Sequence, residues 1–451
     1  MDIKIKITPV DKWIINPVNN FISKSTTGGI VLFISAIVAI FMANSPWAHW
    51  YHEIWEHKIG IALNDTLHLN LSLHHWINDG LMAIFFFVVG LELKREIITG
   101  ELSNVRKAFL PIAAAIGGMI FPALIYIVLN HTGEVHAGWG IPMATDIAFA
   151  LGVLYLLGDR IPTSLKVFLT ALAIVDDLGA VLVIAFFYTS SISYISLSIG
   201  LAFLAVLYIA NKIGVRNTLF YAIVGIAGVW LPFLMSGVHA TIAAVLVAFT
   251  IPIDIRIEET QFVHKMKVYL ERFSTIDPQN KIPTLTNEQM HTVEEMKDIS
   301  NLAIPPLQKL EHALHPFVTF IIMPVFALAN AGVAMDIDFD SLLETNVAVG
   351  VVLGLIVGKF IGVFGLTSIL IKLKIAVLPD GMTTKHLIGV GLLAGIGFTM
   401  SLFVTTLAFT HPEYQLQAKI GILIGSFISG VLGYLVLKSI KKDAPQNSGM
   451  E

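Results

Sequence analysis

The sequence predicts an all-α membrane protein with twelve transmembrane helices, and two observations predict this class. Hydrophobic residues make up 55% of the 451 residues, whereas charged residues make up only 13%. A soluble chain of this length needs about twice that share of charge to cover its surface. Many apolar runs also exceed the roughly 18–20 residues that cross a bilayer as a helix. We therefore expect one polytopic domain, residues 1–451, in the lipid bilayer.

The twelve spans follow from windows of about 19 apolar residues. They are expected near residues 28–44, 76–93, 108–129, 138–158, 164–188, 191–211, 217–234, 236–253, 313–333, 346–370, 386–409 and 417–438. The first span has a second interpretation, because a charged start, a short apolar run and small residues near 42–44 also resemble a signal peptide. Cleavage there would leave the remaining topology unchanged.

Basic residues set the orientation of the spans. Twenty-five of the 28 Lys and Arg residues lie in one set of alternating segments, which includes both termini, whereas the opposite loops hold only Lys58 and Lys419. Cytoplasmic loops are the ones enriched in Lys and Arg, so both termini are expected in the cytoplasm. The net charge is only −4 and no basic block is present, which argues against a nucleic-acid partner.

Two connecting segments are unusually long. The outside (periplasmic) loop 45–75 has two strand-like runs around Asn64-Asp65 and is expected to form a β-hairpin. The cytoplasmic loop 254–311 is polar and carries breakers at Pro278, Pro283 and Pro305. Only a short surface helix over 287–300 is expected there.

Four charged residues lie near the centres of predicted spans. They are Asp146 in the fourth span, Asp176 and Asp177 in the fifth, and Lys359 in the tenth. Each would cost roughly 2.5–3.5 kcal/mol at the bilayer centre if it were unpaired, so we expect them to share a polar cavity. Adjacent residues on a helix point about 100° apart, so one Asp of the pair can meet Lys359 while the other faces Asp146 and an ion. A purely structural ion-pair network is the alternative, but three acids and one base leave surplus negative charge.

Helix breakers accompany these charges. The fourth span carries Gly138, Gly140 and Pro142 just before Asp146, and the eleventh carries four glycines around its centre, at 389, 391, 395 and 397. Interrupted spans at corresponding places in two halves indicate an ion site between inverted repeats, here helices 3–5 and 10–12. We therefore expect helices 4 and 11 to be discontinuous and to cross. Glycines that simply permit close helix packing are the alternative for the eleventh span.

Several segments together resemble the NhaA-type sodium/proton antiporters over nearly the whole chain. The resemblance rests on Gly90–Glu96, Ala144–Gly152, Val175–Ala180, Ser236–Thr241, Glu311–Pro316, Phe326–Gly332, Gly358-Lys359 and Gly395–Ser401. It implies an electrogenic antiporter of the bacterial inner membrane that exchanges Na⁺ or Li⁺ for protons in sodium and pH homeostasis. It also implies a homodimer that forms through the 45–75 hairpin. No cofactor and no enzyme activity are expected.

The resemblance also implies residue roles. Asp177 would be the principal sodium ligand, Asp176 would alternate between the ion and Lys359, and Thr145 and Asp146 would complete the site. A pH-response group would comprise Glu92, Arg95, Glu96, His239, Glu311, His312 and His315. For this group an ordinary alternative stays open, because helix-surface salt bridges and helix-start histidines need no function.

Functions of other classes fit less well. The acidic pair lacks the further acid that intramembrane prenyltransferases need, and Gly395-Ile396-Gly397 is followed by Phe398 rather than by the Asp of intramembrane proteases. A channel would line a continuous pore, which broken helices that cross at the midplane would not provide. A sodium-coupled symporter of a small organic solute remains the alternative, because it can share the interrupted spans.

Overall fold

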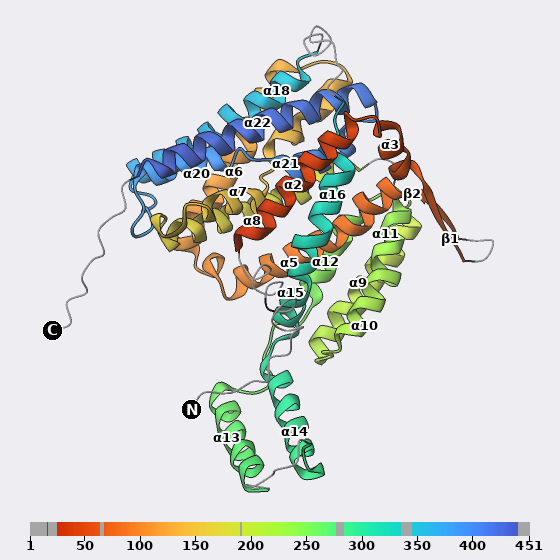
Figure 1. The fold of residues 1–451 in the computed structure, drawn as a ribbon, viewed down its shortest axis with the longest axis vertical. Helices are drawn as coiled ribbons and strands as arrows, with labels where there is room; N and C mark the ends of the chain where they lie inside the picture. The colour runs from red at the N-terminus through yellow and green to blue at the C-terminus, as the bar shows by residue number, and fades with distance from the viewer. Residues whose placement is uncertain are drawn as a thin grey trace, which may run out of the picture.

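The computed structural model describes residue 16 and residues 25–63, 67–189, 192–276, 284–334 and 345–440, and helices dominate it (Figure 1). The α-helices are α2 (Ser25–Ala43), α3 (Ala48–Glu56), α4 (Leu73–His75), α5 (Met82–Ile98), α6 (Val105–Leu129), α7 (Ile147–Tyr155), α8 (Thr163–Phe187), α9 (Tyr194–Ile213), α10 (Thr218–Ile223), α11 (Leu231–Ser236), α12 (Ala240–Thr250), α13 (Glu259–Ile276), α14 (Asn287–Ala303), α15 (Pro306–Phe317), α16 (Met323–Asn330), α18 (Val347–Leu353), α19 (Leu366–Lys372), α20 (Thr384–Leu393), α21 (Phe398–Ala408) and α22 (Pro412–Lys438). Segments of 3-10 helix are Glu101–Ser103, Glu134–Met143 and Gly158–Arg160, and π-helical segments are Trp76–Leu81, Val224–Trp230, Val318–Ile322, Gly354–Gly358 and Ile361–Gly365.

Membrane spans make up most of this architecture. Within the described ranges, nine helical segments are long and apolar enough to cross a membrane, and α20 with α21, bent by 41° at their break, would be a tenth. All ten coincide with predicted spans. Large apolar side chains such as Phe186 and Ile213 are 77% exposed, which suits surfaces that face lipid. The expectation of an all-α membrane protein is confirmed at this level.

The other two predicted spans coincide with α5, preceded by its π-helical turn, and with α12. The predicted range 236–253 was too long, because α12 contains only 11 residues. Gly237 ends α11 in the left-handed region, with φ of 80°. Ile251 is extended, as expected for a residue before proline, and this ends α12.

Lys94 holds the end of α12 in place. It is one of the 25 basic residues expected on the cytoplasmic side, but its side chain is 9% exposed and donates hydrogen bonds to the carbonyl oxygens of Phe249 (2.8 Å) and Ile251 (2.5 Å). A cation is favourable at a helix C-terminus, where unpaired carbonyls carry partial negative charge. Lys94 therefore ties the last turns of α5 to α12.

The predicted β-hairpin is present. Strands β1 (Lys58–Leu63) and β2 (Leu67–Ser72) pair antiparallel, from Lys58 opposite Ser72 to Leu63 opposite Leu67. The expected turn at Asn64-Asp65 lies outside the described residues. The hairpin projects away from the helices on the right-hand side of the view in Figure 1.

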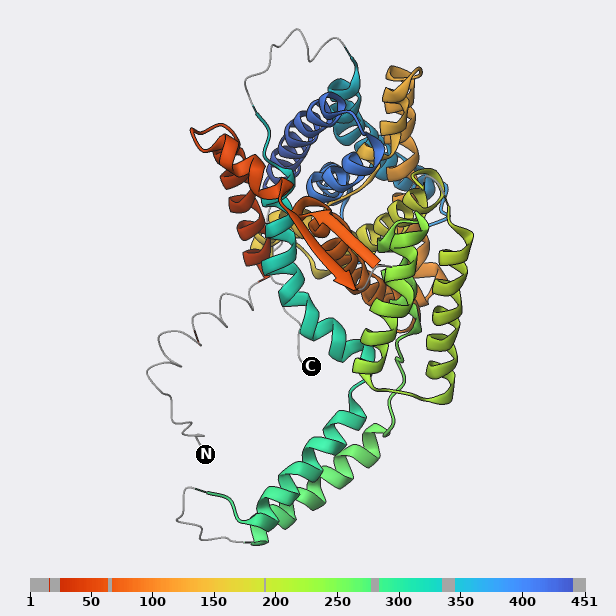
Figure 2. The same ribbon diagram turned by 90° about the vertical axis from the view of Figure 1, so that its right-hand side faces the viewer.

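The 254–311 segment differs from its prediction. The expected helix over 287–300 is present as α14, whose first turn is closed by a capping box between Thr286 and Gln289. A second helix, α13, was not predicted, and it packs beside α14 (Figure 2). Pro278 and Pro283, which are expected to act as breakers in this segment, fall between the two helices, outside the described residues. The pair extends beyond the end of the helix bundle (Figures 1 and 2).

Candidate functional site

Two helical spans are interrupted, and their breaks contact each other. The first passes from 3-10 helix Glu134–Met143 through three non-helical residues into α7, and the second breaks between Leu393 and Phe398. The backbone N–H of Asp146 donates to the carbonyl of Ile396 (2.7 Å), and the Thr145 hydroxyl donates to the carbonyl of Ala394 (2.9 Å). Inside a bilayer, backbone groups freed by a break need partners from protein, and here each break supplies them to the other.

Glycine permits this close approach. A Cβ at Gly395 would lie 2.3 Å from the carbonyl oxygen of Leu355, so any side chain would force apart the second break and the span that carries Lys359. Lys359 itself stands between two π-helical segments, Gly354–Gly358 and Ile361–Gly365. Such local departures from α-helix are frequent at functional sites.

Asp146 lies between the N-termini of two helices. It is 1% exposed, and its Oδ1 accepts a hydrogen bond from the backbone N–H of Phe149 in α7 (2.9 Å). Its Oδ2 accepts from both the backbone N–H (3.0 Å) and the hydroxyl of Thr399 in α21. Both helix N-termini carry partial positive charge, so this position stabilises a buried carboxylate. The carboxylate in turn satisfies N–H groups that the breaks leave without helical partners.

Lys359 joins the two interrupted spans to α8. Its ammonium is fully buried and donates to Asp176 Oδ2 (2.6 Å) and to the hydroxyl of Thr145 (2.9 Å). The Thr145 hydroxyl in turn donates a hydrogen bond to the carbonyl of Ala394, at the C-terminal end of α20. Through this hydroxyl, the ammonium interacts with the negative end of that helix. Charges of both signs are thus placed at helix ends that complement them.

Asp176 and Asp177 have unmet hydrogen-bonding capacity. Both are 1% exposed, and Oδ1 of each has no hydrogen-bond partner within the described residues. Asp177 is in electrostatic range of Asp146, Asp176 and Lys359. A buried carboxylate without donors is costly, so these oxygens call for a proton or a cation. In the described part of the chain, no three His, Cys, Asp or Glu side chains form a group that could hold a metal ion.

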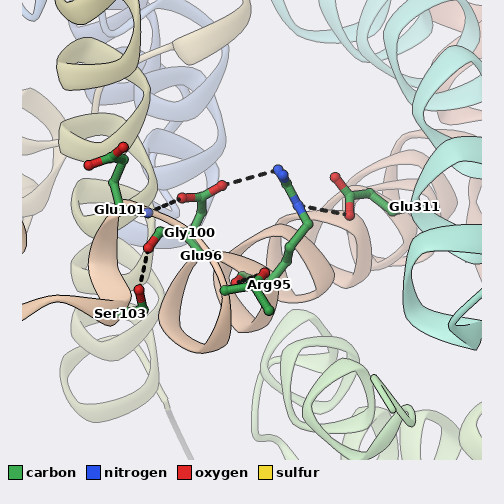
Figure 3. Close-up of polar contacts among 7 residues, drawn as sticks. Arg95, Glu96, Gly100, Glu101, Ser103 and Glu311 are labelled. Atoms are coloured by element: carbon green, nitrogen blue, oxygen red, sulfur yellow. Dashed lines mark hydrogen bonds and ion pairs between the residues drawn. The ribbon is translucent and has the colours of Figure 1, made fainter. Parts of the chain in front are cut away.

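A second charged cluster, Arg95, Glu96 and Glu311, lies where α5 meets α15 (Figure 3). Arg95 reaches Glu96 (Nη2 to Oε1, 3.3 Å) and Glu311 (Nε to Oε2, 3.2 Å), the second as an ion pair without hydrogen-bond geometry. The other oxygen of Glu96 accepts the backbone N–H of Glu101 (3.1 Å). Arg95 is 35% exposed, so its pair with Glu311 holds α5 and α15 together only weakly.

Glu92 connects the two clusters electrostatically. It lies one helical turn before Glu96 on α5, where residues three and four apart share a face. It is in range of Glu311, Arg95 and Glu96 on one side and of Asp177 on the other. Glu92 is therefore in electrostatic range of both clusters.

Comparison with known proteins now identifies the family. The Na⁺/H⁺ antiporter 1 family matches residues 19–437. The chain belongs to this family. A protein of Wolinella succinogenes named Na⁺/H⁺ antiporter NhaA is 49% identical over 422 residues, which cover 93% of this chain and 92% of that protein. A protein of Saccharophagus degradans named Na⁺/H⁺ antiporter NhaA 1 is 46% identical over 96% of this chain and 94% of that protein. A protein of Oleidesulfovibrio alaskensis named Na⁺/H⁺ antiporter NhaA is 48% identical over 95% of this chain and 95% of that protein.

The histidines suggested by the family resemblance do not join one cluster. His239 lies at the start of α12, where its Nε2 is 2.9 Å from the carbonyl oxygen of Tyr188. The Arg95 cluster lies at the opposite end of α12, near the C-terminal turn that Lys94 contacts. The phenol of Tyr188 donates a hydrogen bond to the carbonyl of Ala137 (2.6 Å). His312 and His315 are exposed on α15.

Sequence reasoning missed the hydroxyl groups that complete the site. Thr399 and Ser401 both lie in the Gly395–Ser401 motif, but no role was assigned to them. Ser401 donates to the carbonyl of Ile141 (2.7 Å), and the hydroxyl of Ser426 accepts the N–H groups of Gly397 and Phe398 (both 3.2 Å). The available signal for Thr399 and Ser401 was their position beside a predicted break, where freed backbone groups need side-chain partners.

Proposed function

We propose that this protein exports Na⁺, and also Li⁺, in exchange for protons across the bacterial inner membrane. One observation carries the proposal: Asp146, Asp176 and Asp177 are all buried where two spans break, Asp176 alone pairs with the Lys359 ammonium, and within the described residues Oδ1 of Asp176 and of Asp177 lacks a donor. A structural network would balance its charges, whereas surplus negative charge invites protons or a cation. Membership in the Na⁺/H⁺ antiporter 1 family supports this choice of ions.

The geometry suggests how the two ions compete. In the absence of sodium, Lys359 pairs with Asp176, and a proton neutralises Asp177. Sodium takes oxygens from Asp177 and Asp176, which releases that proton and frees the ammonium from its partner. The ammonium of Lys359, now without its buried counter-charge, gives up its own proton, so one sodium ion replaces two protons and the exchange moves net charge. Asp146 and Thr145 hold the helix ends around the ion without giving up their own hydrogen bonds.

Alternating access follows from the proposed topology of twelve spans. Each interrupted span is the middle member of a triplet: α6, α7 with its preceding 3-10 helix, and α8 in one half, and α18–α19, α20–α21 and α22 in the other. We propose that these triplets are inverted repeats whose broken helices cross. Movement of such a unit against the rest of the protein would expose one site to either side in turn.

Orientation and assembly complete the proposal. The distribution of basic residues supports cytoplasmic termini. The two-stranded β1–β2 sheet has two edges whose backbone groups are open to pairing with another strand. We propose that the hairpins of two protomers meet in a homodimer.

The direct test is ion exchange by the purified protein in proteoliposomes, without any organic solute. A sodium gradient should drive proton movement, and clamping the membrane potential should change its rate because the exchange is electrogenic. Asp177→Asn keeps the side-chain volume and should insert and fold normally but exchange nothing. Robust exchange by Asp177→Asn would overturn the site assignment. Sodium movement that requires an added solute would instead favour the symporter.

A further inference from the structure

A cavity of about 750 Å³ lies where three candidate membrane spans end, and none of the predicted ion-site residues lines it. Its walls come from the beginnings of α6 and α8 and from the segment that follows α19. These three ends belong to the side that the basic residues mark as cytoplasmic. Because the end of a span lies near the boundary between hydrocarbon and water, the cavity opens at that boundary.

One part of the wall is apolar and exposed. Val105 is 80% exposed, Val377 is 85% exposed and Phe109 is 41% exposed. Val167, at 38%, continues this surface along α8. Such a surface is unfavourable against water but suits acyl chains, and its position at the start of the spans places it at the level of the upper chain segments.

The other part of the wall carries charges of both signs. Arg106 and Lys107 begin α6, and Glu101 and Asp380 stand on the same cavity. Lys107 pairs with Glu101 at 3.6 Å, but within the described residues neither the guanidinium of Arg106 nor the carboxylate of Asp380 has an ion-pair partner. The Asp380 segment is fixed to α8, because its carbonyl accepts a hydrogen bond from Ser164 (2.7 Å). One base and one acid therefore face a shared cavity with their charges uncommitted.

We propose that this cavity binds the headgroup of a phospholipid that carries a primary ammonium, that is, a phosphoethanolamine lipid. Its phosphate would meet Arg106 and Lys107, and guanidinium groups bind phosphate with directed hydrogen bonds. Its ammonium would donate to Asp380, and its acyl chains would cover Val105, Phe109 and Val167. An acidic lipid would leave Asp380 unpaired beside a second negative charge. A choline lipid has no N–H to donate.

Bound lipid would connect the spans that carry the buried acids and their counter-charge. α8 carries Asp176 and Asp177, and the span that ends at Lys372 carries Lys359. α6 packs against that span, with Gly118 close to the Lys359 side chain. A ligand that holds these three ends together stabilises their packed arrangement, and ligand binding to the folded state raises the midpoint of thermal unfolding.

The test measures binding and stability of the full-length chain in detergent after removal of native lipid. Unfolding midpoints are compared with added diacyl phosphatidylethanolamine, phosphatidylcholine and phosphatidylglycerol, and native mass spectrometry counts bound lipids. We expect stabilisation in the order ethanolamine, then choline and glycerol lipids. Arg106→Gln and Asp380→Asn should each weaken ethanolamine-lipid binding by about tenfold, because each removes one charge-assisted hydrogen bond. Lys212→Gln, which removes an exposed base on α9 at the same membrane side, should change nothing.

Three results would overturn the proposal. Equal stabilisation by all three lipids would mean nonspecific annular lipid. Equal stabilisation by soluble phosphoethanolamine or inorganic phosphate would mean a site for a free anion rather than for a lipid. Unchanged binding in both charge variants would place the lipid elsewhere. If the variants do not fold, the ranking of the three lipids on the wild-type chain still decides. Because the readout is binding, the outcome is independent of whether the chain exchanges sodium for protons.

Discussion

Replacing Lys359 by Met tests the buried ion pair with little change in side-chain volume. The ammonium is fully buried and donates to Asp176 Oδ2 and to the Thr145 hydroxyl. Lys359→Met removes both hydrogen bonds. Thr145 keeps its own hydrogen bond to the carbonyl of Ala394, so losing the bond from Lys359 costs about 1 kcal/mol of stability there. Asp176 loses its one donor in the described structure, since its Oδ1 already has none.

The carboxylate therefore dominates the cost. Breaking a buried pair by removing one partner costs about 3–5 kcal/mol, because the other charge stays buried without compensation. We expect this loss in full at alkaline pH without sodium. Acidification should reduce it, because protonation of Asp176 removes the uncompensated charge. Saturating sodium should reduce it as well, because a cation can take the place of the ammonium.

A double-mutant cycle measures the pair itself. Unfolding in detergent is followed for wild type, Lys359→Met, Asp176→Asn and the double variant. The double variant should recover most of the lost stability and give a coupling energy of about 2–3 kcal/mol. Additive losses would refute the pairing. A loss in Lys359→Met that neither acid nor sodium reduces would refute the claim that an uncompensated carboxylate causes it.

Three further predictions concern the elements around the site. Thr399→Val should lower the free energy of unfolding by about 1–3 kcal/mol, because it removes a hydroxyl donor from the Asp146 carboxylate that caps α7. Thr399→Ser keeps the hydroxyl and should be as stable as wild type. Equal unfolding midpoints for Thr399→Val and wild type would contradict this role. Arg95→Gln should shift the pH at which exchange is half-activated without changing the maximal rate, and it should change stability by about 1 kcal/mol or less. An unchanged pH profile would mean that Arg95, Glu96 and Glu311 form ordinary surface ion pairs without a role in the pH response. Gly362→Ala would bring a Cβ within 2.1 Å of a backbone carbonyl oxygen of α6. It should lower the free energy of unfolding by about 1–3 kcal/mol and slow ion exchange. In Gly365→Ala the new Cβ meets only a methyl group 3.8 Å away, so stability and exchange should not change.

The charged centre of this protein could be predicted from the sequence because burial of charge in a bilayer is so unfavourable. Asp146, Asp176, Asp177 and Lys359 stand out in otherwise apolar spans, and the structure buries all four. The breaks were predictable for a related reason, since Gly and Pro in mid-span are strong signals when a carboxylate is adjacent. Helix geometry indicated that one acid of the pair meets Lys359, but not that it would be Asp176.

Neutral partners and helix ends could not be predicted in the same way. Thr399 is an ordinary residue of an apolar helix until the fold brings Asp146 to it from about 250 positions away. Lys94 carries the charge of a loop residue, and only the packing of α12 against α5 buries it. α13 was missed because its neighbouring prolines were read as breaking the segment, although prolines between two helices are compatible with both.

The central claim, competition between sodium and protons for the same buried carboxylates, is tested most directly by proton release. Sodium is added to the purified protein in weakly buffered detergent solution, and the pH change is recorded. Wild type should release protons, potassium should release none, and acidification should raise the sodium concentration needed. Asp177→Asn should release none at any sodium concentration. The account would be contradicted by sodium binding without proton release, or by undiminished release from Asp177→Asn.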